Sequence, residues 1–237
     1  MAENIQASAG QAFVADAVAA AGIVKTGEAD ETMEVVGRYV ATLTGPREEC
    51  RDDYLKLRSL WEHAVLMDDL PTAGFIRDQM RAMEEVKWVD EFDNLVTNVG
   101  KIDLLDKYLS GSAYTAAFYL GLVDGGSTPT YNAADTMASH AGWSESAAYS
   151  NSTRPAAAFN SATASGGGSG TAGTGSKATS ATSFTINATA TIAGCFLTTV
   201  STKSGTTGTL YSAGSFTGGN RAVSSGDTLN VTYTAQA

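Results

Sequence analysis

Residues 184–192, Phe-Thr-Ile-Asn-Ala-Thr-Ala-Thr-Ile, alternate apolar and polar side chains with a period of two. Successive side chains of a strand point to opposite faces, so this period predicts a half-buried β-strand. Residues 228–233 repeat the pattern, with Leu229, Val231 and Tyr233 on one face and polar residues on the other. The two segments together predict a sheet that buries one face in a core and presents a threonine-rich face to solvent.

Other segments of the C-terminal half extend this prediction. Further strands are predicted over residues 113–123, 194–200, 209–213 and 222–223. Turns that contain Gly and Ser separate them, and no helical pattern lies between them. Short strands at such spacing predict an antiparallel β-sandwich, jelly-roll-like, although the strand topology stays open. The Gly-rich residues 164–177 are expected to form a flexible surface loop.

The N-terminal half has a helical pattern instead. Apolar residues recur at three- and four-residue intervals, and acidic residues gather where helices would begin. Helices are predicted over about 11–21, 28–43, 46–67, 73–90 and 99–109. The predicted fold class is α+β, with an acidic helical arm or small helical domain over residues 1–97 and a neutral Gly/Ser/Thr-rich β-sandwich domain over residues 98–237.

Charge divides the chain in the same way. The formal net charge is −10, yet residues 111–237 contain only four acidic and four basic residues, so the first 110 residues carry the whole excess. A catalytic pocket usually gathers several ionisable groups in one fold, so this division favours a structural or assembly protein over an enzyme. The acidic balance and the lack of a basic cluster argue against nucleic-acid binding.

The first two predicted helices carry narrow apolar stripes and are separated by glycines. Such helices suit an extended arm that lies on a partner better than a helical domain that folds alone, although both alternatives stay open. The candidate partner-interface residues are Phe13, Val14, Ala17, Val18, Met33, Val36, Val40 and Leu43.

Several patterns look chemical, but structural roles explain them better. The glycines of Gly168–Gly173 fit a dinucleotide fingerprint without the strand and helix that it requires. Asp135, His140 and Ser144 lie too close in sequence for a catalytic triad of usual geometry, and His140 is expected to stabilise a turn. His63 has no second ligand at the i+4 position. We therefore expect no catalytic residue, no cofactor and no metal.

Cys50 and Cys195 lie in different halves and are expected to be reduced, packing residues. The N-terminus lacks the features of a signal peptide, and no stretch approaches ~18 consecutive apolar residues. We therefore expect synthesis in the host cytoplasm and no membrane association.

From about residue 98 onward the chain resembles a family of tailed-bacteriophage virion structural proteins. The segments that carry the resemblance are Val99–Asp106, Gly111–Leu122, Asp135–Trp143, Ser176–Ala178, Ala193–Leu197, Gly205–Ala213 and Ser225–Thr232. The resemblance covers residues 98–237, whereas the first 90 residues match no family.

The resemblance implies a non-enzymatic component of the virus particle. The favoured role is that of a capsid decoration or cement protein on the capsid surface, with the major capsid protein and neighbouring copies of itself as partners, in a homo-oligomer. The alternative is a tail, neck or fibre component that acts in particle assembly or in binding the host surface.

Overall fold

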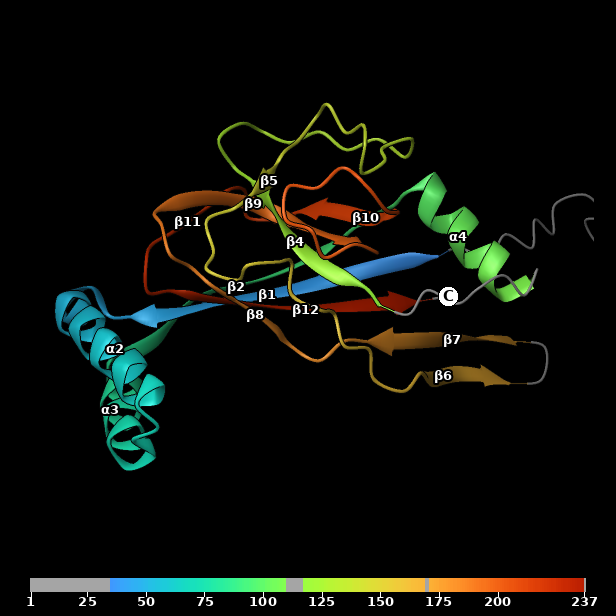
Figure 1. The fold of residues 1–237 in the computed structure, drawn as a ribbon. Helices are drawn as coiled ribbons and strands as arrows, with labels where there is room; N and C mark the ends of the chain where they lie inside the picture. Colours follow the sequence, from blue (N-terminus) through green and yellow to red (C-terminus); the bar gives the residue numbers. More distant parts are fainter. Residues whose placement is uncertain (1–34, 110–116, 169–170, 237) are drawn as a thin grey trace, which may run out of the picture. The chain divides into compact units, whose positions relative to one another are not determined.

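Two antiparallel six-stranded sheets form a β-sandwich in the computed structural model, which describes residues 35–109, 117–168 and 171–236 (Figure 1). With the α-helices that accompany the sheets, the predicted α+β class is confirmed. The helical elements are η1 (Glu48–Cys50), α2 (Arg51–Leu66), α3 (Leu70–Met83) and α4 (Asn98–Leu109).

The first sheet has the strand order β2-β1-β12-β7-β6, and β8 also pairs with β12. Its strands are β1 (Val36–Pro46), β2 (Glu84–Asp93), β6 (Thr163–Gly168), β7 (Thr171–Ala178), β8 (Thr182–Thr185) and β12 (Thr228–Gln236). The second sheet has the order β3-β10-β9-β4-β5, and β11 also pairs with β9. Its strands are β3 (Leu95–Val96), β4 (Tyr119–Asp124), β5 (Glu145–Ser146), β9 (Ala190–Thr198), β10 (Leu210–Ser215) and β11 (Arg221–Val223).

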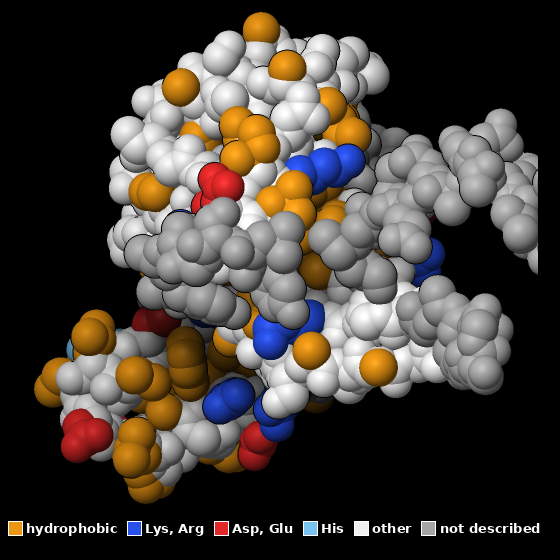
Figure 2. All heavy atoms as spheres, turned by 90° about the vertical axis from the view of Figure 1, so that its right-hand side faces the viewer, with side chains coloured by type: hydrophobic (Ala, Val, Ile, Leu, Met, Phe, Trp, Pro, Cys, Tyr) orange, Lys and Arg blue, Asp and Glu red, His pale blue; other side chains and the backbone are white. Residues whose placement is uncertain are grey.

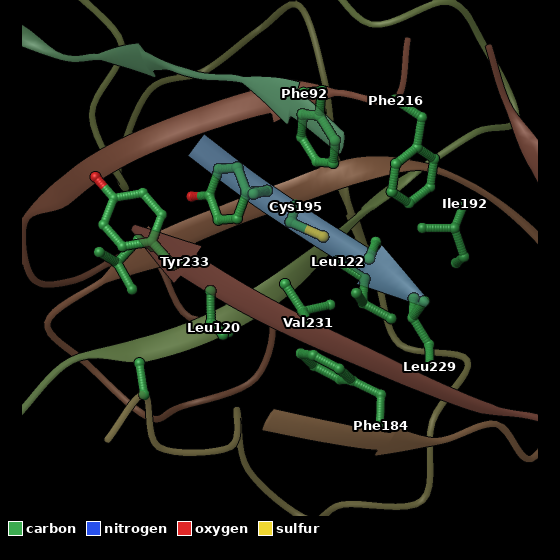
Figure 3. Close-up of a cluster of buried hydrophobic side chains, with 14 of the residues drawn as sticks. Phe92, Leu120, Leu122, Phe184, Ile192, Cys195, Phe216, Leu229, Val231 and Tyr233 are labelled. Carbon is green, nitrogen blue, oxygen red and sulfur yellow. The ribbon is translucent and has the colours of Figure 1, made fainter. Parts of the chain in front are cut away.

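The core lies between the two sheets (Figure 3). Leu122 and Cys195 of the second sheet and Val231 of the first are all fully buried in one cluster. A polar contact also joins the sheets, because the hydroxyls of Tyr39 and Ser212 lie 3.0 Å apart inside the sandwich. Each large apolar side chain buried in this way stabilises the fold by about 1.5–3 kcal/mol relative to exposure.

The predicted strand over 228–233 is confirmed as part of β12. Its three apolar side chains are fully buried, and the polar ones between them are partly exposed. The alternation over 184–192 does not form one strand, since β8 ends at Thr185 and β9 begins at Ala190 in the other sheet. The backbone N–H of Ile186 donates to Asp227 O between them. The chain changes sheets there, with Ile186 and Ile192 buried in the core and Ala188 exposed.

The helix predicted over 28–43 is wrong for residues 36–43, which belong to β1. Tyr39, Ala41 and Leu43 also recur with a period of two, and all three face the core. Residues up to 34, including the helix predicted over 11–21, lie outside the described residues. A short run of apolar residues can fit both the helical period and the strand period. Here the backbone of residues 36–46 pairs with β2 and β12, and this pairing selects the strand.

Two further expectations are corrected. The helix predicted over 73–90 ends at Met83, and the chain continues as β2, because β1 offers it a partner over most of its length. Residues 164–168 and 171–177 belong to the strands β6 and β7 instead of a loop, with Thr163 paired to Ser176. The helices predicted over 46–67 and 99–109 are confirmed as η1 with α2 and as α4.

The first sheet crosses the boundary predicted at residue 97. β1 precedes that boundary, yet it pairs with β12 over nine consecutive positions, from Val36–Gln236 to Thr44–Thr228. Residues 36–46 and 84–93 therefore belong to the sandwich and not to a helical arm. Without β1, one edge of β12 would leave its backbone N–H and C=O groups unpaired.

Candidate partner interface

A helical hairpin connects two strands of the first sheet, since β1 leads into α2 and α3 leads into β2 (Figure 1). Asp52 and Asp53 lie in the first turn of α2, where acidic groups complement the helix dipole. The carboxylate of Asp69 caps α3 by accepting a hydrogen bond from the backbone N–H of Thr72 at 3.3 Å. The start of α3 is thus marked by a side-chain cap, and the start of α2 by its acidic first turn.

The two helices pack on each other through one apolar face each. The buried residues are Tyr54, Ile76 and Met80, flanked by the half-buried Leu57, Trp61 and Met83. The hydroxyl of Tyr54 donates to Glu84 Oε1 at 2.7 Å, and burial together with this carboxylate raises the pKa of the phenol. This small apolar cluster is the contact through which the two helices pack on each other.

The base of the hairpin is tied to the sandwich by Asp227, whose side chain is 1% exposed. Lys87 Nζ lies 2.8 Å from its carboxylate and Arg51 Nη2 lies 3.5 Å from it. Arg51 also donates to the backbone oxygen of Ser225 at 2.8 Å. Gly45 permits this approach, because a Cβ there would lie 2.1 Å from Asp227 Oδ1.

The other end of the hairpin, which we call the tip and define as residues 65–70, exposes large apolar side chains. Leu66, Met67 and Leu70 are 83%, 68% and 66% exposed, and Phe75 on α3 is 66% exposed. Figure 2 shows hydrophobic side chains gathered on the surface of the hairpin. Clustered exposed apolar residues are characteristic of surfaces that bind another protein.

Acidic groups accompany these apolar side chains. Asp68 and Asp69 are both exposed and occupy the turn between α2 and α3, where Asp68 has a positive φ of 56°. No basic residue occurs between Ala64 and Ile76. The tip is therefore apolar and anionic.

A second candidate surface is an apolar groove beside α4, with a volume of about 1100 Å³. Leu104, Phe118, Phe159, Tyr211 and Tyr233 supply its large apolar lining, and three alanines, at 156–158, widen it. The rings of Phe118 and Phe159 meet edge to face with centroids 5.7 Å apart, and Phe118 meets Tyr211 in the same way at 5.6 Å. This aromatic contact gives the groove a defined shape.

Close packing of α4 on β10 positions one wall of the groove. A Cβ at Gly100 would lie 2.5 Å from the backbone oxygen of Tyr211, so the helix approaches the strand as only glycine allows. The hydroxyl of Thr97 donates to the backbone oxygen of Leu210 and accepts from Gly100 N–H. Leu104, one turn later, then faces the groove.

Two lysines lie among the residues that line the groove. Lys107 of α4 pairs with Asp103 at 3.8 Å, and Lys177 of β7 is exposed. Among the described residues of the lining, Asp103 is the acidic member. The groove is thus apolar with a small positive excess.

The interface residues predicted from sequence fall into two groups, one outside the described residues and one on β1. Phe13, Val14, Ala17, Val18 and Met33 lie outside the described residues.

The remaining three predicted interface residues lie on β1. Leu43 is 1% exposed in the core and cannot contact a partner, because the strand period turns it inward. Val36 is 38% exposed and Val40 is half-buried, both on the outer face of the sheet. These two keep a partner role as a prediction.

Two apolar side chains of the hairpin fit the helical period but are not buried. Met67 and Phe75 fit the apolar stripes of α2 and α3, yet both are exposed. Two helices alone can cover one face of each other, so part of a broad apolar stripe stays uncovered. The sequence signal that could have found the tip is the surplus of apolar residues around Leu66, Met67 and Leu70.

The residues that suggested catalysis have structural contacts. His140 Nδ1 lies 3.0 Å from the backbone oxygen of Trp143 and its ring stacks on the indole, as expected for a turn-stabilising histidine. Trp143 Nε1 donates to Asp135 Oδ2 at 3.2 Å. His63 is exposed on α2. Within the described ranges, no group of three or more His, Cys, Asp or Glu side chains is placed to hold a metal ion.

No helix in the described part of the chain combines the length and the apolar character needed to span a membrane. Comparison of the chain with protein-family models, with curated proteins and with solved structures gives no match.

Proposed function

We propose that this chain is a non-enzymatic structural protein of a tailed-bacteriophage virion that binds and stabilises the assembled capsid shell as a decoration or cement protein. The observation that carries the proposal is the hairpin, which is tied to the sandwich at Asp227 and exposes apolar side chains at Leu66, Met67 and Leu70. A rigidly held apolar end suits contact with another subunit in an assembly.

The sandwich supports the same role. Its described C-terminal part carries few charges, and its outer face on β12 presents Thr228, Asn230 and Thr232. Contacts made by such a surface depend little on long-range charge, so salt screens them weakly. This property suits a particle that must persist across ionic conditions.

The sequence resemblance of residues 98–237 to virion structural proteins adds a second, independent reason. In the proposed role the partners are the major capsid protein and neighbouring copies of this chain. The protein would act by mass action, since a ligand that binds only the assembled shell shifts the equilibrium toward it. This role requires no reaction and no cofactor.

Cryo-electron microscopy of the virion that contains this chain tests the proposal. Copies at regular sites over the whole shell are the expected result. A single ring or a few projections at one vertex would overturn the cement role and would favour the tail, neck or fibre alternative.

Particle stability gives a second test. In virions that carry Leu66→Ser with Met67→Ser, the shell should release its genome at a lower temperature than in the parent virion. The matched control is Ile102→Ser, which alters a side chain that is 57% exposed on α4 and lies outside the hairpin. Equal release temperatures for the double variant and the parent would contradict a shell-stabilising hairpin.

A further inference from the structure

We propose that the tip of one copy docks into the groove beside α4 of a second copy, so that the chain associates with itself head to tail. The proposal deepens the proposed function, on which it rests for the contact between neighbouring copies, and it is tested on purified protein without the virion. It commits to one occupant of the groove, namely Leu66, Met67 and Leu70 of the neighbouring copy.

The two surfaces lie at opposite ends of the same strand. The hairpin follows β1 after Pro46, whereas Val35, directly before β1, lines the groove. Gln236, which pairs with Val36 at that end, lines it too. Eleven residues of extended chain span about 35 Å, and no hairpin residue lines the groove of its own copy. The complementary surfaces therefore point to contact between copies.

Shape and polarity agree on the two sides. The tip presents unbranched or γ-branched apolar side chains that are mostly exposed, and the groove presents aromatic and alanine side chains. Its volume of about 1100 Å³ is slightly above the usual range for small-molecule sites, so it can receive several side chains. Burial of the tip there would remove apolar surface of both copies from water.

Charge is complementary as well. Asp68 and Asp69 lie between Met67 and Leu70 in the tip, and Lys107 and Lys177 are among the residues that line the groove. Asp103 already pairs with Lys107 and offsets one of these positive charges. The remaining excess would attract an anionic tip and fix its orientation.

A contact between different patches on two identical copies is heterologous. Such contacts close into rings when the rotation permits and otherwise continue as filaments. An open assembly keeps one free tip at one end and one free groove at the other until the ring closes. This property distinguishes the proposal from a symmetric dimer.

Light scattering on the full purified chain, after size exclusion, tests the proposal over a range of concentrations. The parent chain should show a mass above that of the monomer, and Leu66→Ser with Met67→Ser should raise the dissociation constant about tenfold per side chain. Ala158→Glu places a carboxylate on an exposed wall of the groove and should have a similar effect. Ile102→Ser is the surface control and should keep the parent mass.

Mixing the two defective variants is the decisive step. The tip variant keeps its groove and the groove variant keeps its tip, so an equimolar mixture should form dimers and no larger species. A mixture that stays monomeric overturns the head-to-tail contact, as does a parent chain that is monomeric at ~100 µM. Unchanged self-association of the tip variant would also overturn it, because the association would then not depend on the tip. If Ala158→Glu fails to fold by circular dichroism, Ala162→Glu replaces it in the same groove.

Discussion

Arg154 and Glu145 form a buried ion pair, in which Arg154 Nη2 lies 2.7 Å from Glu145 Oε2 and the two side chains are 0% and 6% exposed. The guanidinium also donates to the backbone oxygens of Val200 and Gly205 at 3.0 and 3.1 Å. Glu145 accepts from the backbone N–H of Ser204 at 2.7 Å. The pair thus ties the segment before residue 155 to the turn that follows β9.

Replacement of one member of this pair should be costly. We expect Arg154→Ala to lower the free energy of unfolding by about 3–5 kcal/mol, because it leaves the carboxylate of Glu145 buried without its partner. The control is Arg38→Ala, which breaks solvent-screened ion pairs to Glu91 and Asp93 and should lower the free energy of unfolding far less. Urea denaturation measures both, and equal losses would contradict the role of burial.

Asp90 predicts a dependence of stability on pH. Burial alone would raise its pKa, but hydrogen bonds from Thr217, Arg221 and the backbone of Gly218 outweigh it and hold the pKa below its usual value. An acid with a lowered folded pKa contributes stability above its unfolded pKa of about 3.9, and the contribution is lost as pH falls through the folded pKa.

Asp90→Asn should therefore lower the free energy of unfolding at pH 7 by about 1–3 kcal/mol, with a loss relative to the parent that becomes smaller as the pH falls below the unfolded pKa of about 3.9. Urea unfolding at pH 7, 5 and 3 measures the difference. Asp93→Asn, at an 82% exposed carboxylate on the same strand, is the control. A difference for Asp90→Asn that stays constant with pH would refute the electrostatic explanation.

Gly45 should be essential for the anchor of the hairpin. A Cβ there would lie 2.1 Å from Asp227 Oδ1, so Gly45→Ala must displace this carboxylate from Lys87. We expect a loss of about 1–3 kcal/mol. Gly74→Ala is the matched control, because its Cβ meets open space on α3, where alanine is the better helix former by about 1 kcal/mol. Thermal unfolding should move down for the first variant and up for the second.

The two cysteines should differ in reactivity. Cys195 is fully buried, and burial raises the pKa of its thiol, whereas Cys50 is partly exposed at the start of the hairpin. A thiol-specific chromogenic reagent should modify one cysteine of the native chain, and both after denaturation in guanidinium. Cys50→Ser should abolish the native reaction. Rapid native modification of Cys195 would contradict its place in the core.

The sequence by itself determined the sandwich and several of its elements. The period of two in β12 survives in the structure because one face of that strand is buried and the other is wet. The caps and breaks around α2 and α4 also act within a few residues of chain, so residues 46–67 and 99–109 could be assigned correctly.

Tertiary structure decided the rest. Residues 36–46 became a strand because β2 and β12 pair with them, and β12 lies almost two hundred residues away in sequence. Leu66 and Met67 are likewise exposed because no other described element covers their side of α2. The period of apolar residues in the sequence does not show which faces of a helix will be covered. Elements whose start, end and period are set by neighbouring residues could thus be predicted from the sequence. The pairing of strands and the burial of helix faces are decided only when segments distant in the sequence pack together.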